Sequence, residues 1–210
     1  MYNSILTGSC SPALMNVIFT GNTGSTYGGG VGNDEESSPT FTNVTFYGNT
    51  ASFGAGISNR GNSNPTVTNA TFTENYASAK GGAVYSNGSH LNMSSSIFWE
   101  NWPDQFEYNV SSTITVSYSD VQGGWAGIGN IDKDPLLGPL ADNGGFTLTH
   151  ALGAGSPAID AGDPLNCPAT DQRGFPRPID GDGLNGPRCD MGAYEYGSQG
   201  FFLYLPFMLK

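Results

Sequence analysis

The chain has 210 residues, which is enough for one substantial hydrophobic core or for one domain with an appendage. It contains 31 glycines, abundant Asn, Ser and Thr, and only 12% charged residues, which argues against a compact helical protein because these residues are poor helix formers. Hydrophobic residues make up 37%, too many for a disordered chain, and 18 acidic against 7 basic residues argue against nucleic acid or an anionic membrane surface as a partner.

A repeat of about 26 residues occupies the first 130 positions. The heptapeptide at 16–22 recurs at 43–49 and 69–75, with a worn copy at 95–101 and a faint fifth copy that ends at 121. A glycine-containing block recurs in phase at 28–31, 54–57 and 81–84. The aromatic position of the heptapeptide is always phenylalanine, in the series Phe19, Phe46, Phe72 and Phe98.

Each repeat predicts three short strands and three turns, and none contains a helical pattern. Short apolar and polar alternations such as 40–42 and 45–47 are typical of strands, and Gly and Asn tolerate the turn conformations between them. Such a unit is one coil of a β-solenoid, in which equivalent residues lie about 4.8 Å apart. We therefore predict an internal stack of the four phenylalanines and two structural asparagine ladders, one of Asn16, Asn43 and Asn69 and one of Asn22, Asn49, Asn75 and Asn101.

This pattern, over roughly residues 1–130, resembles the pectate-lyase-like right-handed parallel β-helix superfamily. The resemblance implies an all-β fold, a right-handed parallel β-helix, but no particular function, because the same fold serves lyases, hydrolases, adhesins and inert stalks. Residues 1–3 align with 31–33, so we expect the chain to begin inside a coil. Upstream coils would then carry the signal peptide and any catalytic site.

From residue 131 the composition becomes rich in Pro, Gly and Asp, which predicts a loop-rich C-terminal cap over 131–196. The segments 134–140, 155–162, 171–174 and 189–195 resemble, in order, the choice-of-anchor domain that ends many bacterial β-helix surface proteins. The resemblance implies a secreted or cell-surface bacterial protein. In the apolar tail, 197–210, the last ten residues are too few to span a bilayer, and either an anchoring signal or a final strand on the cap fits them.

Three cysteines are present, and no two have the spacing of a metal or redox motif. Cys167 and Cys189 bracket a loop rich in Pro, Gly and Asp, where a disulfide would restrict the unfolded chain. We predict that bridge, with Cys10 left over as a small buried residue.

Glu74 and Glu100 are the candidate catalytic residues. They occupy the heptapeptide slot in which Gly21 and Gly48 stand, so they should stack about one strand spacing apart, close to the separation of about 5–5.5 Å in retaining glycosidases. The alternative is a solvated pair of surface acids.

Two histidines and three tryptophans are also candidate catalytic or sugar-binding residues. His90 and His150 are interpreted as polar turn residues rather than catalytic bases. Trp99, Trp102 and Trp125 lie near the worn coils, where they would pack in the core or stack on sugar rings.

A calcium site is a further prediction for the cap. Asp180 and Asp182 flank one residue of a Gly-rich turn, and Asp190, Glu195 and backbone carbonyls would complete the six to eight oxygens that calcium requires. The alternative is a metal-free loop in which Arg177 and Arg188 neutralise the aspartates.

The function predicted from these features is that of a secreted or cell-surface, non-enzymatic protein for adhesion, carbohydrate contact or structural display. Polysaccharide or cell-surface components are the expected partners, with no nucleic acid and no membrane span. The alternative is a fragment of a polysaccharide lyase or glycoside hydrolase whose catalytic coils lie upstream.

Overall fold

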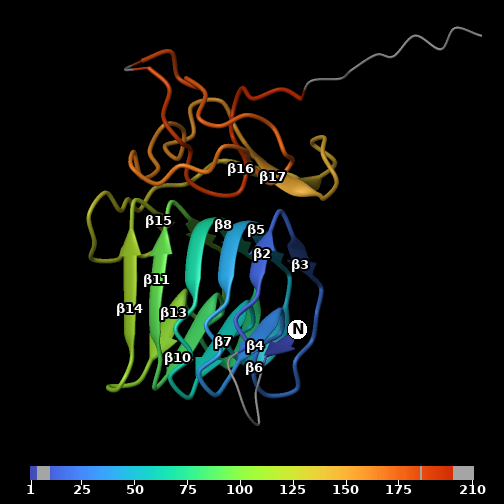
Figure 1. Ribbon diagram of the computed structural model, residues 1–210, viewed down its shortest axis with the longest axis vertical. Helices are drawn as coiled ribbons and strands as arrows, with labels where there is room; N and C mark the ends of the chain where they lie inside the picture. Colours follow the sequence, from blue (N-terminus) through green and yellow to red (C-terminus); the bar gives the residue numbers. More distant parts are fainter. Residues whose placement is uncertain (4–9, 185, 201–210) are drawn as a thin grey trace, which may run out of the picture.

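The computed structural model describes residues 1–3, 10–184 and 186–200, and the last ten residues of the apolar tail therefore lie outside the described residues. Short strands on the faces of the coils pair in parallel with the equivalent strands of the next coil and build a β-solenoid (Figure 1). One sheet contains β1 (Tyr2–Asn3), β4 (Val31–Asn33), β7 (Ile57–Arg60), β10 (Val84–Asn87) and β13 (Phe106–Tyr108). A second contains β2 (Ala13–Met15), β3 (Ile18–Thr20), β5 (Thr40–Tyr47), β8 (Thr66–Thr73), β11 (His90–Ser94), β12 (Ile97–Trp99), β14 (Thr113–Ser117) and β15 (Asp120–Val121). A third pairs β6 (Thr50–Phe53) with β9 (Tyr76–Lys80).

The register between coils follows the sequence repeat. Phe46 pairs with Phe19 and Phe72, and Phe72 pairs with Phe98. Val121 pairs with Phe98, so the faint fifth copy forms part of a coil. The pairing of Tyr2 with Gly32 matches the alignment of the first residues with 31–33.

The predicted phenylalanine stack runs through the core. Ring centroids are 4.9 Å apart between Phe19 and Phe46, 4.4 Å between Phe46 and Phe72, and 4.9 Å between Phe72 and Phe98, with nearly parallel planes. Phe46, Phe72 and Phe98 are fully buried. Large aromatic side chains at one position of every coil thus supply the continuous core of the solenoid.

The ladder that begins at Asn22 is complete. The Asn22, Asn49 and Asn75 amides each donate to the Oδ1 atom of the next asparagine at 3.0, 2.9 and 2.7 Å, ending at Asn101. The backbone N–H of each of the three donates to the same Oδ1 atom. The ladder therefore satisfies buried polar groups at a corner where the strands end.

The ladder that begins at Asn16 stops after one bond, and the prediction of a continuous ladder was wrong. The Asn43 amide donates to Asn16 Oδ1 at 3.1 Å, but also to the carbonyl of Thr170 at 2.7 Å. The Asn69 amide donates to the carbonyls of Asp190 and Gly192 instead of to a neighbouring coil. Backbone carbonyls of the cap compete for these amides, which no repeat pattern reveals.

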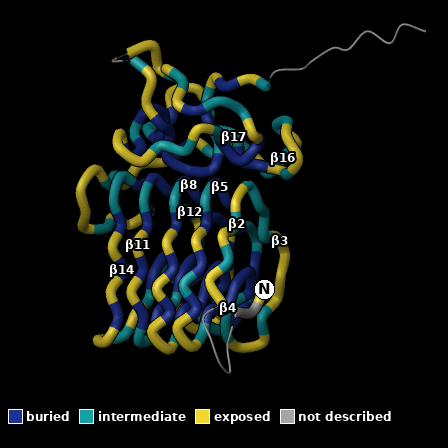
Figure 2. Tube along the Cα trace, in the orientation of Figure 1, coloured by how far each residue is buried: buried dark blue, intermediate teal, exposed yellow. Residues whose placement is uncertain are grey.

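The cap lies across the corner of the coils that contains Asn43 and Asn69. Its buried residues lie toward the solenoid (Figure 2). Thr45 Oγ1 donates to Gln172 Oε1 at 2.7 Å, and the Gly192 N–H donates to the Ser95 carbonyl at 2.8 Å. A Cβ atom on Gly192 would lie 2.8 Å from Ile97 Cδ1, and its φ is +89°, so only glycine permits this approach. Cap and coils share a second apolar cluster of Ile97, Leu152, Ala158, Ile159 and Met191.

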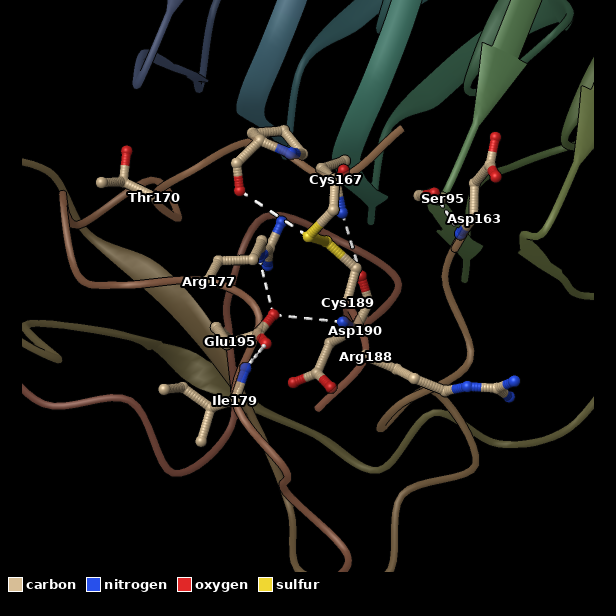
Figure 3. Close-up of a disulfide and its surroundings, with 12 residues drawn as sticks. Ser95, Asp163, Cys167, Thr170, Arg177, Ile179, Arg188, Cys189, Asp190 and Glu195 are labelled. Carbon is tan, nitrogen blue, oxygen red and sulfur yellow. Dashed lines mark hydrogen bonds and ion pairs between the residues drawn. A yellow bond between two sulfur atoms is a disulfide. The ribbon is translucent and has the colours of Figure 1, made fainter. Parts of the chain in front are cut away.

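The cap is largely irregular, as its composition predicts, apart from the antiparallel pair β16 (Leu137–Ala141) and β17 (Thr149–Leu152). A disulfide joins Cys167 and Cys189, whose Cα atoms are 5.8 Å apart (Figure 3). Cys10 is a free, exposed cysteine, so its predicted burial was wrong; it precedes β2 and lies outside the stacked strands. Among the residues that the structure describes, no helix is long and apolar enough to cross a membrane.

Candidate functional site

Glu74 and Glu100 lie together at an outer corner of the solenoid. Each follows a strand, and their predecessors Thr73 and Trp99 are paired in register, so the two glutamates occupy neighbouring coils. Their φ angles are 55° and 57°, in the left-handed region. The equivalent residues of earlier coils have the same conformation and are glycines. Both side chains are exposed.

Glutamate in this conformation is costly, because the left-handed region places Cβ close to a carbonyl oxygen and costs about 1–2 kcal/mol. Glycine removes that cost, and it stands at the same slot in two coils as Gly21 and Gly48. A Cβ atom built on either glycine would have no neighbour within 4 Å, so the slot points into open space. Strained residues of this kind concentrate at functional sites, which favours a ligand-binding role for the two glutamates.

The two glutamates line a cleft of about 480 Å³ between the coils and the β16–β17 hairpin of the cap. Tyr47 and Trp99 contribute half-buried aromatic rings from the coils. Asp134 and His150 line the cleft from the cap. The volume is in the range typical of small-molecule sites.

Tyr47 and His150 are held close to Glu74. A hydrogen bond to the Glu74 carboxylate is the main cause that raises the pKa of Tyr47. The rings of Tyr47 and His150 are 5.1 Å apart. His150 lies on strand β17 and is only 5% exposed, so the interpretation of this histidine as a turn residue was wrong. Burial lowers the pKa of His150, which favours the neutral imidazole.

The remaining aromatic and histidine candidates are dispersed. Trp125 packs edge-on against Phe106 at 4.9 Å, in agreement with a core role. Trp102 is 60% exposed and therefore does not pack in the core. His90 is exposed and begins strand β11, so its interpretation as a turn residue was also wrong; its Nδ1 lies 2.8 Å from Thr113 Oγ1.

The acidic group in the cap differs from the predicted one. Carboxylate oxygens of Asp180 and Asp182 gather with one from Asp160, all within 4.8 Å of one another. Asp190 does not belong to this group: its side chain is buried and accepts hydrogen bonds from the backbone N–H groups of Asp160 and Tyr196. Nor does Glu195, whose carboxylate accepts from Ile179 and Asp190 and faces Arg177.

The arginines do not neutralise Asp180 and Asp182. Arg177 lies inside the cap, with its Nε 2.6 Å from Glu195 Oε2, although this N–H is not aligned for a regular hydrogen bond. In Figure 3 the guanidinium of Arg188 points away from Asp190 and Glu195, and within the described residues it forms no ion pair. Burial raises the pKa of Asp160, as expected for a carboxylate without a nearby cation.

A calcium ion at Asp160, Asp180 and Asp182 therefore stays a prediction. Three carboxylates suit this hard cation, and water or backbone carbonyls would supply the other oxygens. If the folded protein binds calcium, millimolar calcium should raise the melting temperature relative to chelator by mass action. Asp182→Ala should abolish the shift, and a wild-type protein that melts at the same temperature in calcium and in chelator would refute the site.

Stability should also fall as the pH rises from 5 to 7, because Asp120 must release a buried proton. Burial raises the pKa of Asp120 from 3.8 to about 7, and its Oδ2 atom has no hydrogen-bond partner. The unfolded chain has already lost this proton at pH 5. The free energy of unfolding therefore falls by roughly 2 kcal/mol between pH 5 and pH 7. Denaturant melts at both pH values measure the loss. The Asp120→Asn variant should show a smaller dependence, and an identical dependence would exclude Asp120 as its source.

A family model described as a right-handed β-helix region matches residues 3–134, more than half of the chain. Comparisons with curated proteins and with solved structures give no match. The matched segment contains the repeat, the phenylalanine stack and both glutamates of the cleft. The chain therefore belongs to the right-handed β-helix family.

Proposed function

We propose that this protein binds saccharide chains in the cleft between coils and cap, as a non-enzymatic protein that is secreted or displayed on the cell surface. The observation that carries the proposal is the pair Glu74 and Glu100, both in a strained backbone conformation where other coils use glycine. The fold does not require these side chains, since glycine occupies the same position in two earlier coils.

The chemistry of the cleft suits a sugar. Carboxylates accept hydrogen bonds from sugar hydroxyls, and the rings of Tyr47 and Trp99 offer apolar faces for stacking. Tyr76 and Trp102 follow the two glutamates by two residues and are 50% and 60% exposed. They pair with each other across neighbouring coils, so a saccharide longer than the cleft would meet further aromatic surface beyond the corner.

Display at the cell surface rests on the resemblance of residues 132–196 to the choice-of-anchor domain and on the apolar tail. The disulfide between Cys167 and Cys189 supports an oxidising compartment. A protein that binds a polysaccharide in the cleft would adhere to surfaces that carry this polysaccharide, or would be displayed on them.

Hydrolysis or elimination of a polysaccharide is the second candidate. One observation favours it: glutamates on neighbouring strands, about 4.8 Å apart in the backbone, approach the carboxylate separation of retaining glycosidases. Release of reducing ends or of unsaturated sugars during the binding experiment below would establish this activity. In that event Glu74→Gln and Glu100→Gln should each abolish it.

The test is saccharide binding by calorimetry, with Glu74→Gly/Glu100→Gly as the decisive variant. Glycine is the residue of earlier coils at this slot, so the variant should melt at the same or a higher temperature while losing at least about tenfold in affinity, or about 1.4 kcal/mol.

The matched control is Glu36→Gly. Glu36 is also an exposed glutamate with positive φ, 64°, but it lies outside the cleft. Its replacement should leave the affinity unchanged. Wild-type affinity in the double glycine variant, or no binding by the wild type across a broad saccharide panel, would contradict the proposal.

A further inference from the structure

The cleft combines several hydrogen-bond acceptors. Glu74, Glu100 and Asp134 contribute three carboxylates, and none of the described residues that line the cleft is Lys or Arg. The protein as a whole carries a net charge of −11, so charges beyond the cleft reinforce its negative potential. Such a site repels uronic acids and attracts a cation.

His150 adds an acceptor that the protein itself leaves unused. Its Nδ1 lies 2.8 Å from the Gly138 carbonyl, an acceptor, so Nδ1 carries the proton and Nε2 presents a lone pair. Nε2 is buried without a hydrogen-bond partner, and His150 is one of the residues that line the cleft. An unpaired buried acceptor is unfavourable, and a ligand that donates an N–H or O–H to it would remove that cost.

A bare metal ion fits this arrangement poorly. Calcium requires six to eight oxygens at about 2.3–2.6 Å, hence carboxylates that converge on one point. Among the described residues, the group of three that converges in this way is Asp160, Asp180 and Asp182, and the cleft carboxylates do not form another. A larger cation with several N–H donors can instead contact separated acceptors, and the faces of Tyr47 and Trp99 attract ammonium groups by cation–π interaction.

We propose, on the basis of the saccharide-binding function above, that the ligand is an amino sugar polymer with free amines. The sugar ammonium groups would lie between the carboxylates of Glu74 and Glu100, with sugar N–H or O–H groups directed toward His150 Nε2. Acetylation of the amine removes the charge and enlarges the group, so the N-acetylated polymer is the weaker ligand.

The experiment compares glucosamine, N-acetylglucosamine and glucose oligosaccharides of equal length by calorimetry, at a pH that keeps the sugar amines protonated. We expect the glucosamine oligomer to bind at least about tenfold more tightly than the other two, and the preference to weaken with added salt. Glu74→Gln/Glu100→Gln, which keeps side-chain shape and removes charge, should abolish the preference. Glu36→Gln, the matched surface control, should preserve it.

Each other outcome overturns a defined part of the account. Equal affinity for the three oligomers, lost in Glu74→Gly/Glu100→Gly, would overturn the amine preference and leave saccharide binding intact. No binding of any oligomer would overturn both. If Glu36→Gln lowers the preference for the glucosamine oligomer as much as Glu74→Gln/Glu100→Gln does, the preference reflects general attraction to an acidic protein and the proposed site is wrong. Displacement of the glucosamine oligomer by an equimolar lysine oligomer would assign the site to basic peptides instead.

Discussion

Phe46→Ala is expected to lower the free energy of unfolding by about 3–5 kcal/mol, the usual cost of truncating a buried aromatic side chain. Phe46 is fully buried, lies between the rings of Phe19 and Phe72, and meets Phe41 edge-on at 5.8 Å. Truncation would leave a cavity in the middle of the stack, where neighbouring coils on both sides prevent collapse.

Denaturant melts of the wild type and the variant measure this loss. Phe146→Ala is the matched control, because the side chain of Phe146 is fully exposed in the cap, and its removal should change stability by less than about 0.5 kcal/mol. A loss below about 1 kcal/mol for Phe46→Ala would show that the phenylalanine stack does not hold the coils together.

Arg177→Met is expected to have an effect of similar size, about 3–5 kcal/mol, because it removes one partner of a buried ion pair. The side chains of Arg177 and Glu195 are both fully buried. Arg177 also donates to the carbonyl of Gly192 at 3.2 Å, in the segment that contacts the coils. Without the guanidinium, the carboxylates of Glu195 and Asp190 would lie together in the interior with no compensating cation.

The pKa values of these acids point the same way. Burial raises the pKa of Asp190, with repulsion from Glu195 as the second cause, and burial also raises the pKa of Glu195, while Arg177 acts in the opposite direction on both. In Arg177→Met/Glu195→Gln one of the two uncompensated carboxylates is removed, so this double variant should be more stable than Arg177→Met alone. Lys80→Met, which breaks the exposed pair with Glu107, should change stability little. A double variant no more stable than Arg177→Met would show that packing, not charge, dominates.

The solenoid was predictable from the sequence because each coil repeats the environment of the last. Phe19 and Phe46 occupy the same slot, so one period fixes both the strand register and the core. The same logic predicts the ladder from Asn22 to Asn101. It fails for Asn43 and Asn69, because the cap, more than a hundred residues away in the chain, takes their amides.

The cleft was predictable only in part. The repeat placed Glu74 and Glu100 side by side, but it could not place His150, which reaches the cleft through the folding of the cap onto the coils. In the cap, Asp180 and Asp182 were recognisable from their spacing, whereas Asp160 joins them from twenty residues upstream. No period relates these segments, so only the three-dimensional path of an irregular loop brings them together.

A crystal structure of the protein with its tightest-binding oligosaccharide tests the central claim most directly. We expect sugar density in the cleft between the coils and the β16–β17 hairpin, in contact with Glu74 and Glu100 and against the ring of Trp99. Sugar bound elsewhere on the solenoid, with the cleft free of it, would contradict the account.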